Sequence, residues 1–427
     1  MVVIFIHQNF PAQYVHLARH LASIPRNRVY FITQSERNQL PRVIKLIYKP
    51  DTVQSSGCHA YTERFDAAVR TGLAVAEVCR RLRNGGIMPD ILVGHCGWGE
   101  TLFVKDVFPD TPLLANFEYF YHAHGADVGF DPEFSPERSE DGPRLEVRNA
   151  VNRLSFAASD WGHAATAWQR GLFPLPMQER ISLLHEGIDT VRACPDAGAW
   201  LKLGRDDVLL TRADEVITFV ARNLEPYRGF HVLMRALPDI LRRRPRAHVL
   251  IAGGDGYSYG EPPPGGGTFR EALCAELGDS LDLQRVHFLG SVPYDFFINM
   301  LQVSAVHVYL SYPFVLSWSC LEAMAAGCLV VGSATAPVLE VLKDRVNGLT
   351  VDFFDRAALA DRIDEVFEHP DRMQALREAA RDTIVKNYDL ATRLLPRWTD
   401  LLGGLAAGRL PAHAPPSEGL AMHRQLR

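Results

Sequence analysis

Short, almost entirely apolar runs alternate with longer amphipathic segments along most of this 427-residue chain. Val2–Ile6 is the first apolar run, and a polar stretch and an amphipathic segment over residues 13–22 follow it. A strand reads as an uninterrupted apolar run when helices cover both faces of its sheet, because neither face then meets water. The alternation therefore predicts α/β structure, with parallel sheets between layers of helices.

The alternation comes in two series, separated by a stretch that lacks it. Prolines and glycines interrupt this stretch, residues 187–215, which we interpret as a linker region. The further strand candidates are residues 29–32, 90–94, 112–115, 181–184, 216–220, 247–252, 286–289, 305–310 and 329–331. We predict two Rossmann-like doubly wound domains, 1–186 and 216–390, and then a C-terminal helix and loose tail over 391–427.

The composition excludes several classes of protein. The chain has 45 Lys and Arg against 50 Asp and Glu, so its formal net charge of −5 gives no general attraction to nucleic acid or to an anionic membrane. Hydrophobic residues make up 47% of the chain, which excludes a disordered or collagen-like protein. No apolar run approaches the roughly 18 to 20 residues of a spanning helix, and no signal peptide marks the start. We expect a cytoplasmic protein.

The metal-binding residue types are scattered. The seven cysteines are odd in number and form no C-x-x-C pair, which suggests neither a disulfide framework nor a zinc site. His122 and His124 lie close together in the sequence, but no third ligand follows at the spacing of a zinc site. We therefore expect reduced thiols and no metal.

Two arginines follow the first strand of the second series, in the stretch RNLEPYRG at 222–229. Arg222 and Arg228 flank a turn that opens a helix, so both guanidinium groups can converge on a charged group above the sheet, aided by the helix N-terminus. We interpret them as a candidate diphosphate site. A solvated loop with two surface arginines is the alternative.

A glycine-rich turn follows the next strand. Gly253, Gly254, Asp255 and Gly256 form neither a G-x-G-x-x-G fingerprint nor a Walker loop, but glycines allow a backbone to approach a ligand closely. We take Gly254 and Asp255 as candidate ligand contacts. A bare turn that introduces the insertion at 257–267 is the alternative.

A carboxylate lies inside an otherwise apolar helical stretch, FVLSWSCLEAMAAG at 314–327. Ser317 and Ser319 can cap the helix, and the N–H groups of its first turn suit a phosphate. Glu322 needs a partner if it is buried, and it can accept hydrogen bonds from a pair of sugar hydroxyls. An exposed glutamate, or one paired to an arginine, is the alternative.

These motifs carry a resemblance when they are taken together. R-x5-R-G, G-G-D-G and L-E-A-M-A-x-G-x-x-V-V resemble, in this order, the C-terminal half of the family 4 retaining glycosyltransferases. HQNFPAQ, HCGWGET and GADVGFDPEF resemble the N-terminal half of one bacterial branch of that family. The resemblance covers most of residues 1 to about 390. It implies the GT-B fold, in which two Rossmann-like domains face a cleft.

The resemblance also implies roles in the second half. Arg222 and Arg228, the latter in place of the usual Lys, would neutralise the diphosphate of a nucleotide-sugar donor, and Glu322 would bind the ribose hydroxyls. The family pattern E-x7-E is broken, because Phe314 stands eight residues before Glu322. The remaining donor-binding candidates are then Leu316, Ser317 and Trp318 for the sugar or phosphate, Val292 in the loop 291–294 near the base, and Gly254 and Asp255.

The first half would supply the acceptor side and contacts to the donor sugar. Asn9 and Phe10 lie on the first βα loop, where relatives place a close-approach loop, and His122 is a further acceptor-side candidate. His95 follows the strand 90–94, and Glu118 follows the strand 112–115, near the position of a functional His in many relatives. We expect both to be catalytic, with structural loop hydrogen bonds as the alternative.

We therefore expect a retaining glycosyltransferase that uses a nucleotide-diphosphate sugar and a saccharide or glycolipid acceptor, with no cofactor. Bacterial surface polysaccharide or glycoconjugate synthesis is the usual setting of such relatives, at the inner face of the membrane with peripheral contact. Two alternatives stay open. Phe314 would suit a GT-B-shaped binding or scaffold protein without transfer activity, and the fold also serves sugar-nucleotide epimerases and phosphorylases, although L-E-A-M-A disfavours these.

Overall fold

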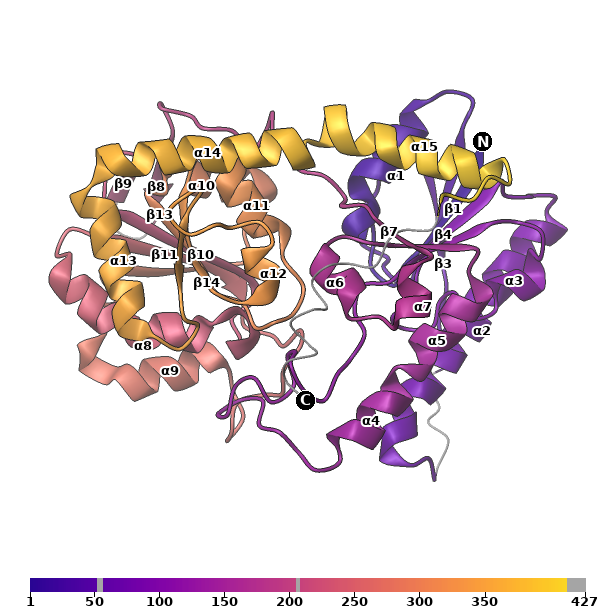
Figure 1. The fold of residues 1–427 in the computed structure, drawn as a ribbon, viewed down its shortest axis with the longest axis horizontal. Helices are drawn as coiled ribbons and strands as arrows, with labels where there is room; N and C mark the ends of the chain where they lie inside the picture. The colour runs from indigo at the N-terminus through magenta and orange to yellow at the C-terminus, as the bar shows by residue number, and fades with distance from the viewer. Residues whose placement is uncertain (52–56, 205–207, 413–427) are drawn as a thin grey trace. The chain divides into compact units, whose positions relative to one another are not determined.

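A computed structural model describes residues 1–51, 57–204 and 208–412, and these form two compact units (Figure 1). Unit 1 comprises Met1–Gly125, Glu137–Gly187 and Leu390–Arg427, and unit 2 comprises Ala126–Pro136 and Ile188–Asp389. The chain therefore passes from one unit to the other at four places. Most of the predicted tail, residues 413–427, lies outside the described residues.

Unit 1 is built on a parallel sheet of seven strands in the order β3-β2-β1-β4-β5-β6-β7. Its strands are β1 (Val2–Ile6), β2 (Arg28–Thr33), β3 (Val43–Ile47), β4 (Ile91–His95), β5 (Leu113–Asn116), β6 (Trp161–Ala164) and β7 (Ile181–Leu183). Its helices are α1 (Val15–Ser23), α2 (Glu63–Asn84), α3 (Val104–Val107), α4 (Asp141–Arg148), α5 (Ala150–Ala158), α6 (Ala167–Gly171), α7 (Leu175–Gln178) and α15 (Leu395–Ala406), with 3-10 turns at Ala12–Tyr14 and Ala60–Thr62 and a π-helical turn at Leu390–Leu394.

The apolar runs of unit 1 arise because each strand is buried on both faces. In β1, Val3 and Phe5 pack in a core with α1 and α15, whereas Ile4 and Ile6 pack in a second core with α2 and α3. Successive side chains of a strand point to opposite faces, so one run serves both cores. The C-terminal helix that we predicted is α15, and its Trp398, 1% exposed, belongs to the first of these cores.

Unit 2 has a parallel sheet of six strands in the order β12-β11-β10-β13-β14-β15, and a two-stranded antiparallel sheet, β8-β9. The strands are β8 (Trp200–Leu203), β9 (Val208–Thr211), β10 (Val216–Asn223), β11 (His248–Gly254), β12 (Val286–Gly290), β13 (Val306–Tyr309), β14 (Leu329–Ser333) and β15 (Leu349–Val351). The helices are α8 (Phe230–Arg243), α9 (Phe269–Leu277), α10 (Tyr294–Val303), α11 (Trp318–Ala325), α12 (Ala336–Leu339), α13 (Arg356–Glu368) and α14 (Pro370–Tyr388), with 3-10 turns at Pro226–Arg228 and Gly278–Ser280.

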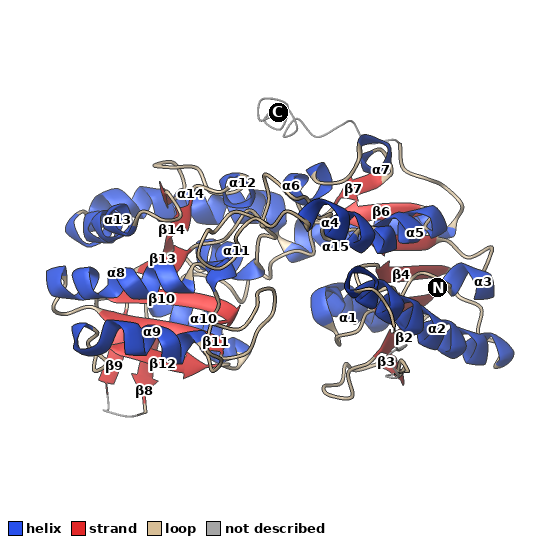
Figure 2. Cartoon of the chain, turned by 90° about the horizontal axis from the view of Figure 1, so that it is seen from below, coloured by secondary structure: helices blue, strands red, loops and turns tan. Residues whose placement is uncertain are grey.

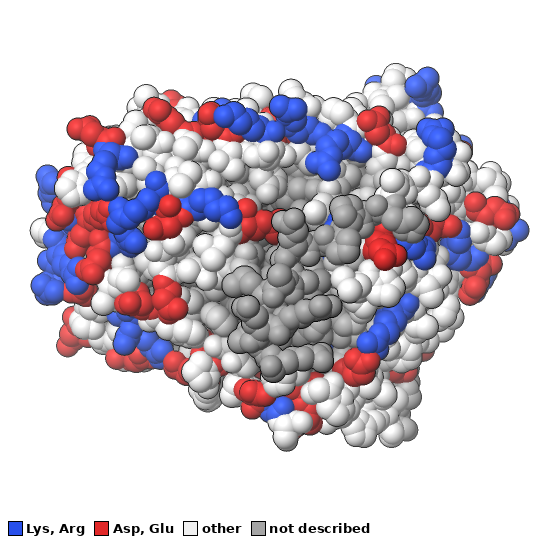
Figure 3. Space-filling view, in the orientation of Figure 1, with Lys and Arg blue, Asp and Glu red and all other residues white. Residues whose placement is uncertain are grey.

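Helices cover both faces of this sheet. Figure 2 shows α8 and α9 in front of the strands and α10 behind them. On the α8 side, Arg243 and Arg244 pair with Asp361, Asp364 and Glu368 of α13. Figure 3 shows this mixture of positive and negative side chains at the left of the view, where α8 and α13 lie in Figure 1. The charges on this face of the helices therefore largely neutralise one another.

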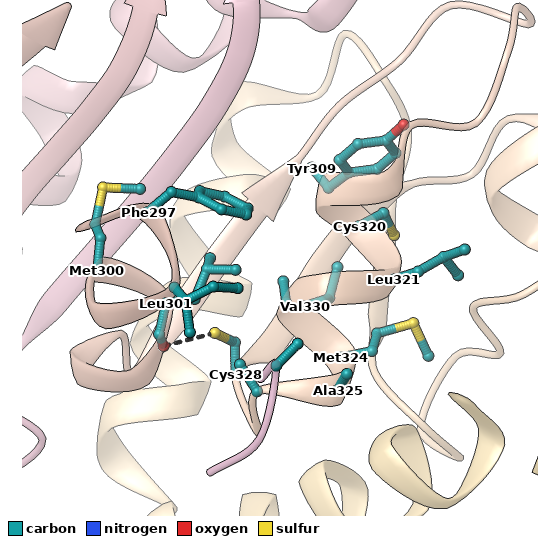
Figure 4. Packing of buried hydrophobic residues seen from close by; sticks show 14 of the residues in the cluster. Phe297, Met300, Leu301, Tyr309, Cys320, Leu321, Met324, Ala325, Cys328 and Val330 are labelled. Atoms are coloured by element: carbon teal, nitrogen blue, oxygen red, sulfur yellow. Dashed lines mark hydrogen bonds between the residues drawn. The ribbon is translucent and has the colours of Figure 1, made fainter. Parts of the chain in front are cut away.

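The opposite face of the sheet packs on α10, α11 and α14. Figure 4 shows side chains of α10, among them Phe297 and Leu301, beside Cys328, Val330 and residues of α11. The Cys328 Sγ donates a hydrogen bond to the Leu301 carbonyl oxygen at 2.9 Å. The hydroxyl of Tyr309 points away from these apolar side chains (Figure 4). Tyr309 thus belongs to the core by its ring and presents a polar atom to the loop above it.

The predicted α/β class with parallel sheets and two Rossmann-like folds is confirmed. We predicted residues 187–215 as a linker, but unit 2 already begins at Ile188. Within this region, β8 and β9 form an antiparallel hairpin. Leu201 and Leu203 of β8 and Leu210 of β9 are buried in the core of unit 2, and this burial stabilises the hairpin. In the described part of the chain, no helix is long and apolar enough to cross a bilayer.

Candidate active site

Arg228 ends the 3-10 turn between β10 and α8, and its side chain is buried, with 6% exposed. Its Nη1 atom donates to Tyr309 Oη at 3.1 Å, to Ser311 Oγ at 2.9 Å and to the Val315 carbonyl oxygen at 2.8 Å. Tyr309 ends β13, the neighbour of β10 in the sheet, and Ser311 and Val315 lie in the loop that follows it. Arg228 therefore ties together the two loops at the carboxyl ends of these strands.

The glycine after Arg228 is required by its conformation and by its surroundings. Gly229 has a φ of +69°, and a Cβ atom there would lie 2.3 Å from Leu310 Cβ. Since side chains disfavour this left-handed region, glycine allows the turn to lie directly on Leu310, the residue after β13, and to place Arg228 beside the loop that follows.

Arg222 differs from Arg228 in its environment. It lies near the end of β10, and its side chain is exposed. The sequence predicted two equivalent arginines over a turn. The structure instead gives one guanidinium fixed by buried hydrogen bonds and one that faces solvent.

The loop after β13 leads into α11 through Leu316, Ser317 and Trp318. The backbone N–H of Ser317 donates to Tyr309 Oη at 2.8 Å. Ser317 occupies the N-cap position of α11, but its hydroxyl bonds to Ser319 Oγ at 2.6 Å and makes no capping hydrogen bond. The capping that we predicted from the serines is therefore wrong. The Tyr309 hydroxyl fixes the start of this helix instead.

Glu322 is buried in α11, with 6% exposed, and accepts a hydrogen bond from Tyr294 Oη at 2.7 Å. Burial raises the pKa of the Glu322 carboxyl to about 7, and the Tyr294 hydrogen bond and the charge of Arg192 offset this only in part. The Arg192 guanidinium lies over the Tyr294 ring, 4.4 Å from its centroid. The carboxylate in the apolar helix is therefore paired with Tyr294, the first residue of α10. Tyr294 lies in the loop region that we predicted, together with Val292, to be near the nucleotide base.

The glycine-rich turn packs on the end of β10. A Cβ atom on Gly254 would lie 2.7 Å from Asn223 Oδ1, so this position needs glycine for its close approach. Asp255 Oδ2 accepts from Arg270 of α9 at 2.6 Å. Asp255, which we predicted as a ligand contact, is therefore engaged in an ion pair within unit 2.

Glu225 is a buried residue that the sequence analysis missed. Its Oε2 atom accepts from the backbone N–H groups of Ser258, Tyr259 and Gly260 at 3.3, 3.1 and 3.1 Å. These contacts hold the insertion so that the Tyr259 ring lies 5.7 Å from the Arg228 guanidinium. A carboxylate between the two arginines of RNLEPYRG was the available signal.

Phe314, the departure from E-x7-E, is 7% exposed. Its ring packs edge-on against Tyr227 at 5.5 Å and against Tyr259 at 4.9 Å between centroids. The position therefore belongs to an aromatic cluster that supports the loops around Arg228.

In unit 1, the two predicted catalytic residues lie together. His95 Nε2 is 3.2 Å from Glu118 Oε2, because His95 ends β4 and Glu118 follows the adjacent strand β5. The Gly97 N–H donates to His95 Nδ1 at 3.0 Å, so the hydrogen of the neutral ring is on Nε2, which donates a hydrogen bond to the carboxylate. His95 is buried and stacks on Trp98, whereas the Glu118 side chain is 42% exposed. The pair thus presents an oriented carboxylate.

A second buried carboxylate in unit 1 was missed by the sequence analysis. Glu100, in the segment HCGWGET, is fully buried and accepts from the Gln8 N–H at 3.2 Å and from Tyr48 Oη at 3.3 Å. Burial raises the pKa of Glu100, although these hydrogen bonds oppose the rise. Glu100 thereby holds the loop after β1.

The acceptor-side candidates have three different environments. Asn9 is exposed, and its N–H donates to His7 Nδ1 at 2.9 Å. His122 Nε2 donates to the Leu172 carbonyl oxygen at 2.7 Å. Phe10 is 5% exposed and packs on Phe31 in the core, so its ring serves packing and does not fit the acceptor role that we predicted.

Two family models match the chain. Residues 25–193 match the glycosyl transferase family 4 group, and residues 205–383 match the glycosyl transferases group 1. A D-inositol 3-phosphate glycosyltransferase of Corynebacterium efficiens is 28% identical over 294 residues, which cover 66% of this chain and 63% of the relative. An uncharacterized glycosyltransferase of Methanocaldococcus jannaschii, MJ1607, is 30% identical over 175 residues, 41% of each chain. The matches thus span less than two thirds of these relatives.

Solved structures share the fold over nearly the whole chain. A sucrose-phosphate synthase from Thermosynechococcus elongatus has a TM-score of 0.72 at 17% identity, covering 96% of this chain and 100% of its own. Anabaena HepE, in complex with UDP and glucose, has a TM-score of 0.65 at 15% identity, covering 94% of this chain and 99% of its own. The family resemblance drawn from the motifs is confirmed: the chain belongs to the family 4 glycosyltransferases and has the GT-B fold.

Proposed function

We propose that the protein is a retaining glycosyltransferase that uses a nucleotide-diphosphate sugar as donor. The observation that carries the proposal is the pair of buried charged groups, Arg228 and Glu322, in the elements that follow β10 and β13. Ligands of open α/β sheets bind beyond the carboxyl ends of the strands, which is where these groups are anchored. A buried charge is costly without partners, and a nucleoside diphosphate offers further partners to both: phosphate oxygens to the arginine and ribose hydroxyls to the carboxylate.

The two arginines bind the diphosphate of the donor, and Glu322 binds its ribose. Arg222 is exposed and free to turn toward a diphosphate, while Arg228 supplies a fixed positive charge. Charge-assisted contacts to the leaving diphosphate strengthen as its negative charge develops, and this stabilises the transition state. Glu322 accepts from the ribose hydroxyls. The departing phosphate oxygen takes the acceptor proton, so no covalent nucleophile is required.

Glu118 is our candidate for the group that acts on the transferred sugar. His95 holds its carboxylate by donating from Nε2. A carboxylate in this orientation stabilises developing positive charge on the sugar or accepts a hydrogen bond from one of its hydroxyls. Asn9, exposed on the loop after β1, is the remaining acceptor-side candidate.

We propose a UDP-sugar as donor, because HepE has been solved with UDP and with UDP-glucose. The acceptor that we propose is a saccharide or glycolipid used in bacterial surface polysaccharide or glycoconjugate synthesis, at the cytoplasmic face of the membrane. The name of the Corynebacterium relative adds a phosphorylated cyclitol to the acceptors worth assaying.

A thermal-shift screen over UDP-, GDP-, ADP- and dTDP-sugars tests the donor. A ligand at 100 times its Kd stabilises the native state by about 2.7 kcal/mol, which raises the melting temperature. The donor that binds is then incubated with and without acceptors, and release of nucleoside diphosphate is measured. Sugar transfer to an acceptor supports the proposal. Epimerisation of the donor alone, or binding without any turnover over a broad acceptor panel, contradicts it.

A further inference from the structure

A segment from the middle of the N-terminal half docks on unit 2. Ala126–Pro136, which we name the crossing segment, belongs to unit 2 although both of its chain neighbours belong to unit 1. It contains all of the GADVGFDPEF motif except Gly125, and this motif has no role in the proposed function. Its aromatic residues pack on unit 2: Phe130 contacts Tyr312 and Phe353, and Phe134 contacts Phe269. Apolar contacts therefore anchor the segment.

Two buried aspartates of the crossing segment accept hydrogen bonds from tyrosines in the loops after β10 and β13, which we call the donor loops. Asp127 Oδ2 accepts from Tyr227 Oη at 2.9 Å, and Asp131 Oδ2 accepts from Tyr312 Oη at 2.5 Å. Asp127 is 3% exposed and Asp131 is 1% exposed. His231 Nε2 of α8 also lies 3.2 Å from Asp131 Oδ2. Burial alone would raise the pKa of Asp131, but these hydrogen bonds outweigh it and lower the pKa, so the carboxylate stays charged.

The two tyrosines contact each other and lie next to the residues around Arg228. Tyr227 directly precedes Arg228, and Tyr312 follows Ser311, whose hydroxyl accepts from Arg228. Their rings lie 4.6 Å apart, and the Tyr312 N–H donates to the Tyr227 carbonyl oxygen at 3.0 Å. A shift of either ring therefore moves the backbone on one side of Arg228.

We propose that Asp127 and Asp131 are positioning residues of the donor site, which hold Tyr227 and Tyr312 so that Arg228 and the loop before α11 keep the geometry that a nucleoside diphosphate requires. The inference rests on the proposed function, since it presupposes that these loops bind the donor. Phe130 and Phe134 supply the apolar contacts that dock the segment, whereas the two carboxylates fix the direction of the tyrosine hydroxyls.

The test is a double-mutant cycle between Asp127 and Tyr227, read by UDP affinity. Asp127→Ala and Tyr227→Phe each remove one partner, and each is expected to weaken UDP binding in calorimetry by about three- to tenfold. The double variant is expected to bind no more weakly than either single one, because the contact is already lost. Asp127→Asn keeps an acceptor oxygen and is expected to restore affinity to within about twofold of wild type.

Glu133→Gln is the matched control on the same segment. The Glu133 side chain forms an ion pair with Arg235 of α8 at 2.7 Å. This variant is expected to shift the melting temperature slightly and to leave the UDP Kd unchanged. If Asp127→Ala lowers the melting temperature but leaves the Kd unchanged while wild type binds UDP, the positioning role is overturned and the proposed function stands. If wild type binds none of UDP, GDP, ADP and dTDP, both are overturned.

Discussion

The hydroxyl of Tyr294 donates to Glu322 Oε1 over 2.7 Å and joins the first residue of α10 to a buried carboxylate in α11. This contact explains how a charged residue is accommodated in the apolar helix, because the phenol supplies the hydrogen bond that a buried carboxylate needs. Tyr294 is itself 37% exposed, so a ligand can reach this end of the pair.

Glu322→Gln is expected to weaken binding of UDP and of the full UDP-sugar equally, since the proposed contact is to ribose. Replacing a charged acceptor by an amide should cost on the order of 1.5 to 3 kcal/mol. Calorimetric Kd values for both ligands measure this, and Tyr294→Phe serves as a comparison in which the carboxylate is kept. An unchanged Kd for UDP in Glu322→Gln would remove the residue from the nucleotide site.

The stability of the protein should fall with rising pH because of Glu322. Its carboxyl has a pKa of about 7 in the folded chain against an ordinary value of 4.5, so the folded state holds a proton that the unfolded state has lost between these values. The stabilisation from this group is complete below about pH 4.5 and is lost as the pH rises through about 7. The total change is on the order of 3 kcal/mol.

Urea denaturation at several pH values between about 4.5 and 8 measures this dependence. The comparison is with Glu322→Gln, which cannot ionise. The difference in unfolding free energy between the two proteins should change steadily across this range. Parallel curves for wild type and variant would contradict the raised pKa.

The two arginines should respond differently to replacement. Arg222→Ala removes an exposed side chain, so turnover should fall strongly while stability changes by no more than about 0.5 kcal/mol. Arg228→Ala also removes turnover, but it leaves the Tyr309, Ser311 and Val315 oxygens without their buried donor and should destabilise the fold by about 3 kcal/mol. Denaturation curves and kcat/KM values for both variants separate the effects. Near-normal kcat/KM in Arg222→Ala would exclude it from the diphosphate site.

Glu118→Gln is expected to bind UDP normally and to lose kcat by about 100-fold or more, because its interaction is made chiefly in the transition state. His95→Gln, which weakens the hold on the carboxylate, should show a smaller loss of the same kind. Steady-state kinetics with varied donor give both values. Full turnover in Glu118→Gln would exclude the carboxylate from the reaction and leave His95 as the unit 1 candidate.

Trp398→Ala is expected to destabilise unit 1 by about 3 to 5 kcal/mol. The indole is 1% exposed, packs edge-on against the His163 ring, and donates from Nε1 to the His185 carbonyl oxygen at 3.0 Å. Urea denaturation measures the loss, with Trp200→Ala as a control because that side chain is 58% exposed. Equal effects of the two replacements would mean that α15 contributes little to the core.

Local patterns predicted most of the fold and supplied the residues of the candidate site, whose roles stay predictions. The run Val2–Ile6 identified a strand buried on both faces, and the apolar stretch around Glu322 identified α11, because each signal lies within a few consecutive residues. The hairpin of β8 and β9 was missed, since its burial depends on a distant core. The crossing segment was likewise predicted in the N-terminal domain, because the residues that it contacts in unit 2, such as Tyr227 and Tyr312, lie 100 and 181 positions further along the chain.

At the site, residue type was predictable and environment was not. Arg222 and Arg228 read alike in the sequence, yet one is exposed and the other is buried under Tyr259. His95 and Glu118 were separate candidates until the order of the sheet placed β4 beside β5. Phe10 was assigned by its place on a loop, although its ring turns into the core.

The four passages of the chain between the units bear on how such a protein can be recombined with its relatives. A chimera joined at Gly187 and Ile188 would inherit its crossing segment from one parent and the tyrosines that it meets from the other. The same junction would graft a foreign α15 onto the native core around Trp161. Exchange of donor specificity by swapping halves therefore requires two transplanted pieces, residues 126–136 and residues 188–389, while the C-terminal helix stays with the first half.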